Sequence, residues 1–254
     1  MDDFAGGQIP VAHRLNTVPE RNTMVGKRLP ESLRRRSARA ALIIEALRKN
    51  YPDARCALDF NTPAELLIAT ILSAQSTDRV VNSVTPELFS RFPVPEMLSK
   101  AELAEIEQIV RPCGYYRQKA RSIKETATVL SSRYNGRVPA SMRDLLTLRG
   151  VARKTANVVL SVAFGINEGV AVDTHVARLS RRLRLTAAMR PEVIEKDLMT
   201  EIPNSEWGDF TTLLIAHGRA VCSARRPRCS VCCISGLCPS AFRPPSWSRS
   251  RMKK

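Results

Sequence analysis

Four cysteines near the end of the chain are spaced like the ligands of a metal cluster. Cys222, Cys229, Cys232 and Cys238 follow the pattern C-x6-C-x2-C-x5-C, and Cys233 is an extra neighbour of Cys232. Disulfides are disfavoured, because the cysteine count of 7 is odd and no export signal precedes them. Zinc sites usually pair two short knuckles, whereas only one exists here. A loop of this kind can wrap its thiolates around a [4Fe–4S] cluster, which we predict as the cofactor, with zinc as the alternative.

The cysteine loop is also rich in cations. Arg225, Arg226 and Arg228 lie between its first two cysteines. Four thiolates carry much negative charge, so nearby guanidinium groups offset part of it, and the surplus cations can bind phosphate. His217, just before the loop, is expected to donate a hydrogen bond toward the cluster rather than to bind it.

A lysine lies beside a glycine turn between two predicted helices. The segment Leu148–Ala156 reads LRGVARKTA, so a short helix enters a turn at Gly150 and a second helix begins soon after. The first N–H groups of that helix have no partner within it and can bind a DNA phosphate. Lys154 stands in its first turn, where the helix dipole disfavours the ammonium form. Its amine is either a nucleophile that forms a Schiff base or a plain phosphate contact.

An acidic residue follows an apolar segment and precedes another predicted helix. Asp173 comes after Val170–Val172 and directly before Thr174, which is the position of an N-cap. Taken alone, Asp173 is a cap. Together with Lys154, it supplies the amine and the carboxylate needed to displace a base from a deoxyribose carbon. His175, next along the helix, is expected to be packed or hydrogen-bonded rather than catalytic.

Two further polar segments could meet a nucleic acid. Leu72–Asp78 (LSAQSTD) ends an apolar helix in a polar cluster that contains Gln75. Gly114–Ala120 (GYYRQKA) combines small, aromatic and basic residues, which suit a loop that wedges between stacked bases. Leu72–Asp78 has a functional role only if Gly114–Ala120 lies beside it in the fold; otherwise it is an ordinary helix end.

The elements that must position these residues are helical. Apolar spacing and helix-start signals predict an all-α fold of about ten helices, and no segment shows the alternation of a strand. The predicted helices are 38–49, 64–72, 79–92, 100–110, 118–134, 141–146, 153–164, 174–183, 191–201 and 206–218. Thr62–Glu65 is a capping box that opens the helix 64–72, which is nearly all apolar and therefore expected to be buried.

Length and composition leave room for one large domain or two small ones. The 254 residues include 40 Lys and Arg against 24 Asp and Glu, for a formal net charge of +16. That charge favours a polyanionic partner, with nucleic acid ahead of an anionic membrane surface. No apolar run approaches the roughly 18–20 residues of a membrane span, and the first ten residues are not a secretory signal. We expect a cytoplasmic, nucleoid-associated monomer with no membrane partner.

The two ends of the chain differ from its middle. Residues 1–36 mix glycines and prolines without periodicity and close on three consecutive arginines, and residues 241–254 combine Pro244 and Pro245 with several cations. We interpret residues 1–36 as a basic, disordered leader and residues 241–254 as a basic tail that is disordered or loosely docked. For residues 1–36 the alternative is an arm that binds the DNA backbone.

Together these segments resemble the endonuclease III family, the helix–hairpin–helix DNA glycosylases that carry an iron–sulfur cluster. The resemblance runs from about Ala38 to Pro239 and rests on the segments quoted above, together with Gly150–Leu160, Val172–Val176 and His217–Arg219. It implies two helical domains with DNA bound in the cleft between them. Residues 56–167 would form a six-helix barrel with its helix–hairpin–helix at about 141–165. Residues 37–55 and 168–240 would form the [4Fe–4S]-loop domain.

The same resemblance implies roles for single residues. Lys154 matches the nucleophile and Asp173 the catalytic aspartate. Gln75 would fill the space left by a flipped nucleotide, Asp78 would lie near the lesion pocket, and the loop at Tyr115 would wedge the opposite strand. Contacts between the hairpin and DNA would come from Arg149, Gly150, Ala152, Arg153 and Thr155.

The implied activity is that of a bifunctional DNA glycosylase and AP lyase. It would excise oxidised pyrimidines from duplex DNA and nick the abasic site by β-elimination through a lysine Schiff base. The hairpin departs from the family pattern L-P-G-[VI]-G, with Arg149 in place of proline and Ala152 in place of the second glycine. That departure keeps open a weakly active or non-catalytic, structure-sensing DNA-binding paralogue. A monofunctional adenine glycosylase would lack Lys154, and the charge and helical body disfavour a ferredoxin-like electron carrier.

Overall fold

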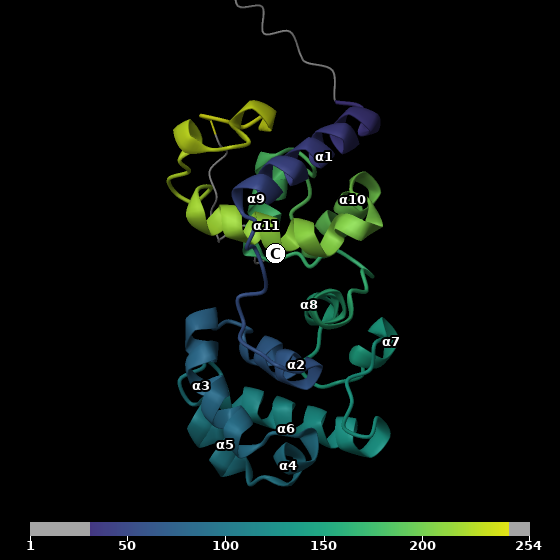
Figure 1. Cartoon of the computed structure of the whole chain (residues 1–254), viewed down its shortest axis with the longest axis vertical. Helices are drawn as coiled ribbons and strands as arrows, with labels where there is room; N and C mark the ends of the chain where they lie inside the picture. Colours follow the sequence, from purple (N-terminus) through teal and green to yellow (C-terminus); the bar gives the residue numbers. More distant parts are fainter. Residues whose placement is uncertain (1–30, 244–254) are drawn as a thin grey trace, which may run out of the picture. The chain divides into compact units, whose positions relative to one another are not determined.

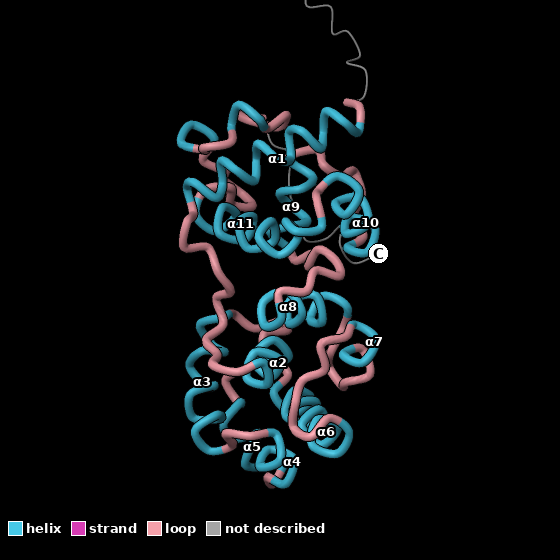
Figure 2. The backbone as a smooth tube through the Cα atoms, turned by 45° about the vertical axis from the view of Figure 1, so that its right-hand side comes forward, coloured by secondary structure: helices cyan, strands magenta, loops and turns pink. Residues whose placement is uncertain are grey.

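The computed structural model describes residues 31–243. All secondary-structure elements in that range are helices (Figure 1). The α-helices are α1 (Leu33–Asn50), α2 (Pro63–Leu72), α3 (Asp78–Arg91), α4 (Pro95–Lys100), α5 (Leu103–Val110), α6 (Tyr116–Arg133), α7 (Met142–Leu145), α8 (Arg153–Phe164), α9 (Thr174–Arg182), α10 (Pro191–Glu201) and α11 (Trp207–Ala220). Three short 3-10 helices accompany them, namely η1 (Asn204–Glu206), η2 (Cys229–Val231) and η3 (Ser235–Leu237). Figure 2 shows no strand in the described part, so the all-α prediction is confirmed there. What we predicted for residues 1–30 and 244–254 lies outside the described residues.

The helix-start signals in the sequence act as caps in the structure. The side chains of Thr62, Ser141 and Asp173 each accept a hydrogen bond from the backbone N–H three residues on, at 3.2, 3.4 and 2.7 Å. Gly165 ends α8 in the left-handed conformation, with φ of 66°. Capping of this kind satisfies backbone groups that have no partner inside the helix. These three helix starts and this helix end were therefore predictable from local residues.

The first helix begins earlier than predicted. Ser32 caps α1, so the helix starts at Leu33 rather than at residue 38. Arg36 forms an ion pair with Glu201 of α10, with 2.8 Å between Nε and Oε1. The predicted leader boundary at residue 36 thus falls inside α1, because a serine cap and a packed helix face extend the helix into the arginine run.

One short helix was missed. α4 starts at Pro95, where proline suits the first helical position. Lys100, predicted to open the next helix, instead ends α4, and Ala101 is extended between α4 and α5. A helix of six residues offers too little periodicity to be recognised from spacing alone.

The described residues from Ser32 onward make one compact unit, and two apolar cores lie within it. The first core surrounds α2, which packs against α3, α6 and α8 (Figure 1). All residues from Leu66 to Leu72 are buried, which confirms the prediction of a buried helix. The second core is built from α1, α9, α10 and α11. α8 also contacts α11, so the two cores meet beside the helix that carries Lys154.

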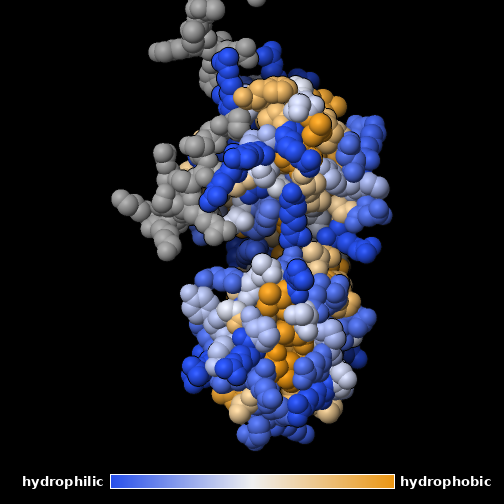
Figure 3. All heavy atoms as spheres, turned by 90° about the vertical axis from the view of Figure 1, so that its left-hand side faces the viewer, coloured by the Kyte–Doolittle hydropathy of each residue, from blue (hydrophilic) through white to orange (hydrophobic). Residues whose placement is uncertain are grey.

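The described surface is largely hydrophilic on the face shown in Figure 3. None of the described helices is both long enough and apolar enough to cross a membrane.

Candidate active site and cysteine loop

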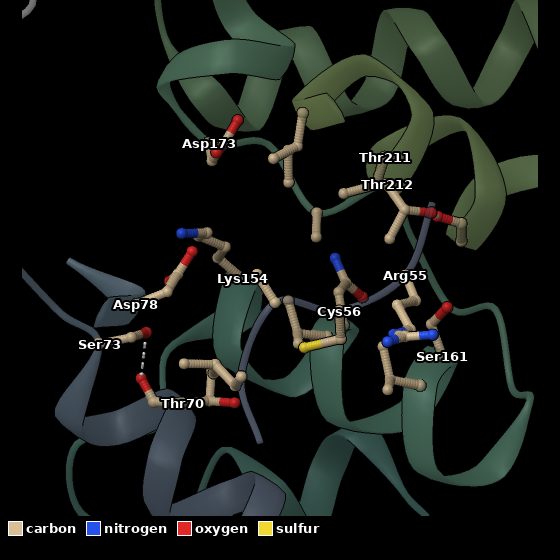
Figure 4. A pocket seen from close by; sticks show the side chains of 18 of the residues that line it. Arg55, Cys56, Thr70, Ser73, Asp78, Lys154, Ser161, Asp173, Thr211 and Thr212 are labelled. Atoms are coloured by element: carbon tan, nitrogen blue, oxygen red, sulfur yellow. Dashed lines mark hydrogen bonds between the residues drawn. The ribbon is translucent and has the colours of Figure 1, made fainter. Parts of the chain in front are cut away.

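One cavity brings Lys154 and Asp173 together (Figure 4). Its volume is about 140 Å³, and α2, α3, α8 and α11 line it together with the segments that precede α2 and α9. A cavity of about 150 Å³ in another protein binds benzene. The space beside Lys154 therefore suits a single six-membered ring.

Lys154 presents its amine to this cavity. It lies on the first turn of α8 with an exposed side chain. Figure 4 shows the amine pointing between the carboxylates of Asp78 and Asp173. Among residues 31–243 we find no hydrogen-bond or ion-pair partner for it. The amine is thus available to a molecule that enters the cavity.

The two carboxylates reach the cavity from different helices. Asp173 caps α9 through Oδ1 and is half-buried, so its second oxygen is not used by the cap. Asp78 is the first residue of α3 and forms an ion pair with Arg219 of α11. That ion pair joins a helix of the first core to a helix of the second.

Several residues of the cavity were not predicted to be there. Cys56 lines it, is partly buried and also packs against the first core. Burial raises the pKa of the Cys56 thiol. Thr211 and Thr212 of α11 also face the cavity, and no local motif marks them. Cys113, by contrast, is 1% exposed and does not line the cavity.

The hairpin before α8 requires its glycine. Gly150 has φ of +80°, and a Cβ there would lie 3.1 Å from Cβ of Ser122 and 3.2 Å from Cγ2 of Ile71. Ala152, which replaces the second family glycine, is the N-cap of α8 with φ of −95°. That backbone conformation is open to any residue. The alanine therefore causes no backbone strain.

Arg149, which replaces the family proline, is held by α6. Its guanidinium donates to both oxygens of Glu125, at 2.6 and 2.8 Å. Its carbonyl accepts a hydrogen bond from the hydroxyl of Thr126 at 2.9 Å. Arg149 thus fixes the hairpin to α6, in addition to the DNA contact expected of it.

Arg153 and Thr155 flank Lys154 on α8. Nε of Arg153 donates to the buried carboxylate of Glu195 on α10, at 3.0 and 2.9 Å. Asn157 donates to the same carboxylate at 2.8 Å. Thr155 is half-buried. The first turn of α8 is therefore held by a carboxylate from the second core, which the sequence did not reveal.

The segments around Gln75 and Tyr115 lie side by side, as their functional interpretation requires. The backbone N–H of Gly114 donates to Oγ of Ser76 at 3.1 Å. Nζ of Lys119 donates to the same oxygen at 2.7 Å. Gln75 and Tyr115 are both exposed and both left-handed, with φ of 54° and 58°.

The four predicted cluster ligands line a second cavity. Cys222, Cys229, Cys232 and Cys238 surround it, whereas Cys233 is exposed and does not line it. Within residues 31–243, no three His, Cys, Asp or Glu side chains gather closely enough to hold a single metal ion. The four thiols are thus arranged around a space rather than around a point.

Two side chains contact these thiols from the helices. His217 is buried, with Nε2 3.4 Å from Sγ of Cys232 and Nδ1 2.9 Å from the hydroxyl of Tyr51. Burial lowers the pKa of His217 to about 4, so the ring is neutral near pH 7. Arg182, also buried, donates to Sγ of Cys222 at 3.1 Å. Burial raises the pKa of the Cys232 thiol to about 11, so its thiolate needs a neighbouring cation.

The chain matches a known family over its central part. The model of the HhH-GPD superfamily base excision DNA repair proteins matches residues 68–204. Endonuclease III of Synechocystis sp. is 53% identical over 203 residues, which cover 80% of this chain and 93% of that protein. The chain belongs to the endonuclease III family. Endonuclease III of Bacillus subtilis is 42% identical, over 74% of this chain and 86% of that protein. By this close homology, the protein is a bifunctional glycosylase and AP lyase of base excision repair.

Solved structures of endonuclease III share this fold. One is an endonuclease III trapped as a covalent intermediate with DNA, in an estranged-adenine complex. Its TM-score is 0.75 at 41% identity, over 85% of this chain and 99% of that chain. A non-covalent endonuclease III–DNA complex gives the same TM-score at 40% identity, over 86% of this chain and 99% of that chain. The family resemblance and the coarse fold predicted from sequence are therefore confirmed.

Proposed function

We propose that this endonuclease III homologue removes oxidised pyrimidines from duplex DNA and nicks the strand through Lys154. The observation that carries the proposal is that the amine of Lys154 and the carboxylate of Asp173 line one cavity with room for a single ring. A pyrimidine flipped out of the duplex presents such a ring, joined to a sugar carbon that an amine can attack. The solved structure of a relative trapped covalently with DNA supports the same chemistry here.

The reaction follows from these groups. The neutral amine of Lys154 attacks C1′ of the sugar, and the base leaves with the electrons of the glycosidic bond and takes up a proton. The carboxylate of Asp173 stabilises the positive charge that develops on the sugar. After ring opening, the lysine adduct becomes an imine, which acidifies the neighbouring C2′ proton. Loss of that proton expels the 3′ phosphate and cuts the strand.

The surrounding residues would hold the DNA. The turn at Gly150 and the first N–H groups of α8 suit a phosphate, because helix N-termini bind anions without reading sequence. Arg149, Ala152, Arg153 and Thr155 border the same site. Gln75 and Tyr115 are exposed on neighbouring loops, where they could occupy the space of the flipped nucleotide and separate the opposite strand. Asp78 would lie beside the flipped base.

The four cysteines would hold a [4Fe–4S] cluster. They surround a cavity, which suits a cluster with a metal at each corner better than a single zinc ion. The cluster would supply a rigid centre for the loop rather than a chemical step. Arg182 and His217 would contact its sulfur ligands.

The two apolar cores support two domains with DNA in the cleft between them, divided at about residues 56 and 167. The protein would act as a monomer at the nucleoid in the cytoplasm, where its DNA substrate lies.

Borohydride trapping tests the proposed function. Purified protein is incubated with duplex oligonucleotides that carry thymine glycol, uracil, an abasic site or adenine opposite 8-oxoguanine, with and without borohydride. The parent should nick the thymine glycol and abasic duplexes and form a covalent adduct. Lys154→Gln should lose both products but keep DNA binding. Lys196→Gln, an exposed lysine of α10, is the matched control and should behave like the parent. An adduct that persists in Lys154→Gln would refute the assignment of the nucleophile.

A further inference from the structure

Lys119 is a buried cation beneath the two exposed loops. It lies on the first turns of α6 and is only 5% exposed. Its Nζ donates to Oγ of Ser76 at 2.7 Å, and that oxygen also accepts the backbone N–H of Gly114 at 3.1 Å. Two donors, one from the loop before α6 and one from α6 itself, thus meet on one hydroxyl from the loop before α3.

Ser76 and its backbone donor Gly114 are each adjacent in sequence to a left-handed residue. Ser76 follows Gln75, and Gly114 precedes Tyr115. The left-handed conformation is uncommon for residues other than glycine and persists where the surrounding structure enforces it. A Cβ on Gly114 would lie 3.4 Å from the carbonyl oxygen of Gln75, so the two backbones are close. The left-handed turns at Gln75 and Tyr115 therefore depend on the same contacts at the hydroxyl of Ser76.

The buried ammonium of Lys119 links α6 to the loop that carries Gln75. A charged group out of water is costly unless it is hydrogen-bonded, and Ser76 provides its acceptor. Burial lowers the pKa of Lys119, while the neighbouring Cys113 thiol acts in the opposite direction. If either loop moved away alone, the amine of Lys119 or the hydroxyl of Ser76 would lose its partner.

Lys119 is not part of the cavity that holds Lys154. It does not line that cavity, and its amine is occupied by Ser76. Lys119 is the next candidate nucleophile after Lys154. Its position outside the cavity indicates a structural role instead.

We propose that Lys119 is a positioning residue that holds the Gln75 and Tyr115 loops as one unit for insertion into duplex DNA. The inference rests on the proposed function, in which both side chains occupy space inside the duplex. Insertion is needed only where an opposite strand is present. Lys119 should therefore matter for duplex substrates and not for single-stranded abasic DNA, which needs Lys154 and the phosphate contacts alone.

The test compares Lys119→Met with Lys124→Met. Methionine keeps most of the buried stem of Lys119 and removes the charge, so the variant should fold. Lys124 lies five residues on in the same helix, is half-buried, and its amine has no partner in the described part of the chain. Two readouts are used with each protein. The first is the rate of borohydride trapping on single-stranded and duplex abasic DNA. The second is the fluorescence of 2-aminopurine placed opposite a non-cleavable abasic analogue, which rises when that base is unstacked.

The expected result is selective. Lys119→Met should trap single-stranded abasic DNA within about twofold of the parent rate and lose about tenfold on the duplex, the order expected for a lost hydrogen bond to a charged group. Its 2-aminopurine signal should fall in parallel, whereas Lys124→Met should match the parent in both readouts. Ser76→Ala should reproduce the defect and Ser76→Thr, which keeps the hydroxyl, should restore the duplex rate.

Two outcomes would overturn the inference. Equal losses on both DNA forms would mean that Lys119 only supports the fold, and unchanged duplex trapping would mean that it does not couple the loops. Failure of the proposed function is a different result, because the parent itself would then neither nick nor form an adduct.

Discussion

The two carboxylate oxygens of Glu195 on α10 share the single Nε–H of Arg153 on α8, at 3.0 and 2.9 Å. Arg153 immediately precedes Lys154, and Asn157 donates to the same carboxylate from one turn further along α8. Glu195 is 6% exposed, whereas the Arg153 side chain is 46% exposed. A buried acid in the second core thus orients the helix turn that carries the proposed nucleophile.

Replacing Glu195 by Gln should destabilise the protein. The variant keeps an acceptor but loses the charge that faces Arg153, so the free energy of unfolding should fall by about 1–3 kcal/mol. The midpoint of urea unfolding of anaerobic protein measures this change. The control is Glu192→Gln on the same helix, whose pair with Arg190 is 3.6 Å long and exposed. Such a pair contributes about 0–1 kcal/mol. Equal shifts of the unfolding midpoint in the two variants would show that the buried network stabilises the protein no more than an exposed ion pair does.

Asp173 should be separable into a cap and a catalytic carboxylate. Asparagine caps a helix about as well as aspartate, so Asp173→Asn should unfold at nearly the parent midpoint. Base release from thymine glycol duplex should nevertheless slow by about 100–1000-fold, because one preorganised charge is lost from the reacting centre. Asp173→Ala should show the same slowing and also lose about 1 kcal/mol of stability. Single-turnover glycosylase assays and urea unfolding give the two quantities. Parent-like base release by Asp173→Asn would remove Asp173 from the mechanism.

The cysteine loop makes a prediction about metal content. Serine at any of Cys222, Cys229, Cys232 or Cys238 should abolish the yellow-brown colour and the bound iron and sulfide. Cys233→Ser is the matched control, because its side chain is exposed and does not line the cavity. It should retain both. Stoichiometric zinc without iron in freshly prepared anaerobic parent protein would contradict the cluster assignment.

Stability should fall as the pH drops below about 6.5, in part through His175. Burial lowers the pKa of His175, against the opposing charge of Asp173, and Arg178 donates to its Nδ1 at 3.1 Å. The unfolded chain therefore binds a proton more readily than the folded protein, so stability is present above the unfolded pKa and is lost as the pH falls through it.

Urea unfolding at several pH values from 7.5 to 5.5 measures this dependence for the parent and for His175→Gln. The variant should show a shallower slope. The slope should not vanish, because the lowered pKa of His217 acts with the same sign. Identical slopes in the two proteins would exclude His175 as a contributor.

The hairpin shows how far local sequence can be trusted. The sequence predicted the turn at Gly150 and the start of α8, and both occur because they depend on backbone conformation near the residue. It marked Ala152 as a departure from the family pattern, and the φ of −95° shows that this alanine causes no backbone strain. It did not reveal that Arg149 pairs with Glu125, since that partner lies 24 residues away on α6.

The sequence by itself determined the helical class, three caps, the buried helix α2 and the family, because each depends on short-range spacing or on segments in a recognisable order. It also named Lys154 and Asp173 as candidates. Only the tertiary structure decided that the amine of one and the carboxylate of the other line one cavity, that Cys56 lines it too, and that Glu195 holds the helix of Lys154. These facts depend on packing between helices far apart in the chain. Buried charges such as Glu195 and Lys119 contact their hydrogen-bond partners only in the packed protein. No local sequence pattern therefore predicts these contacts.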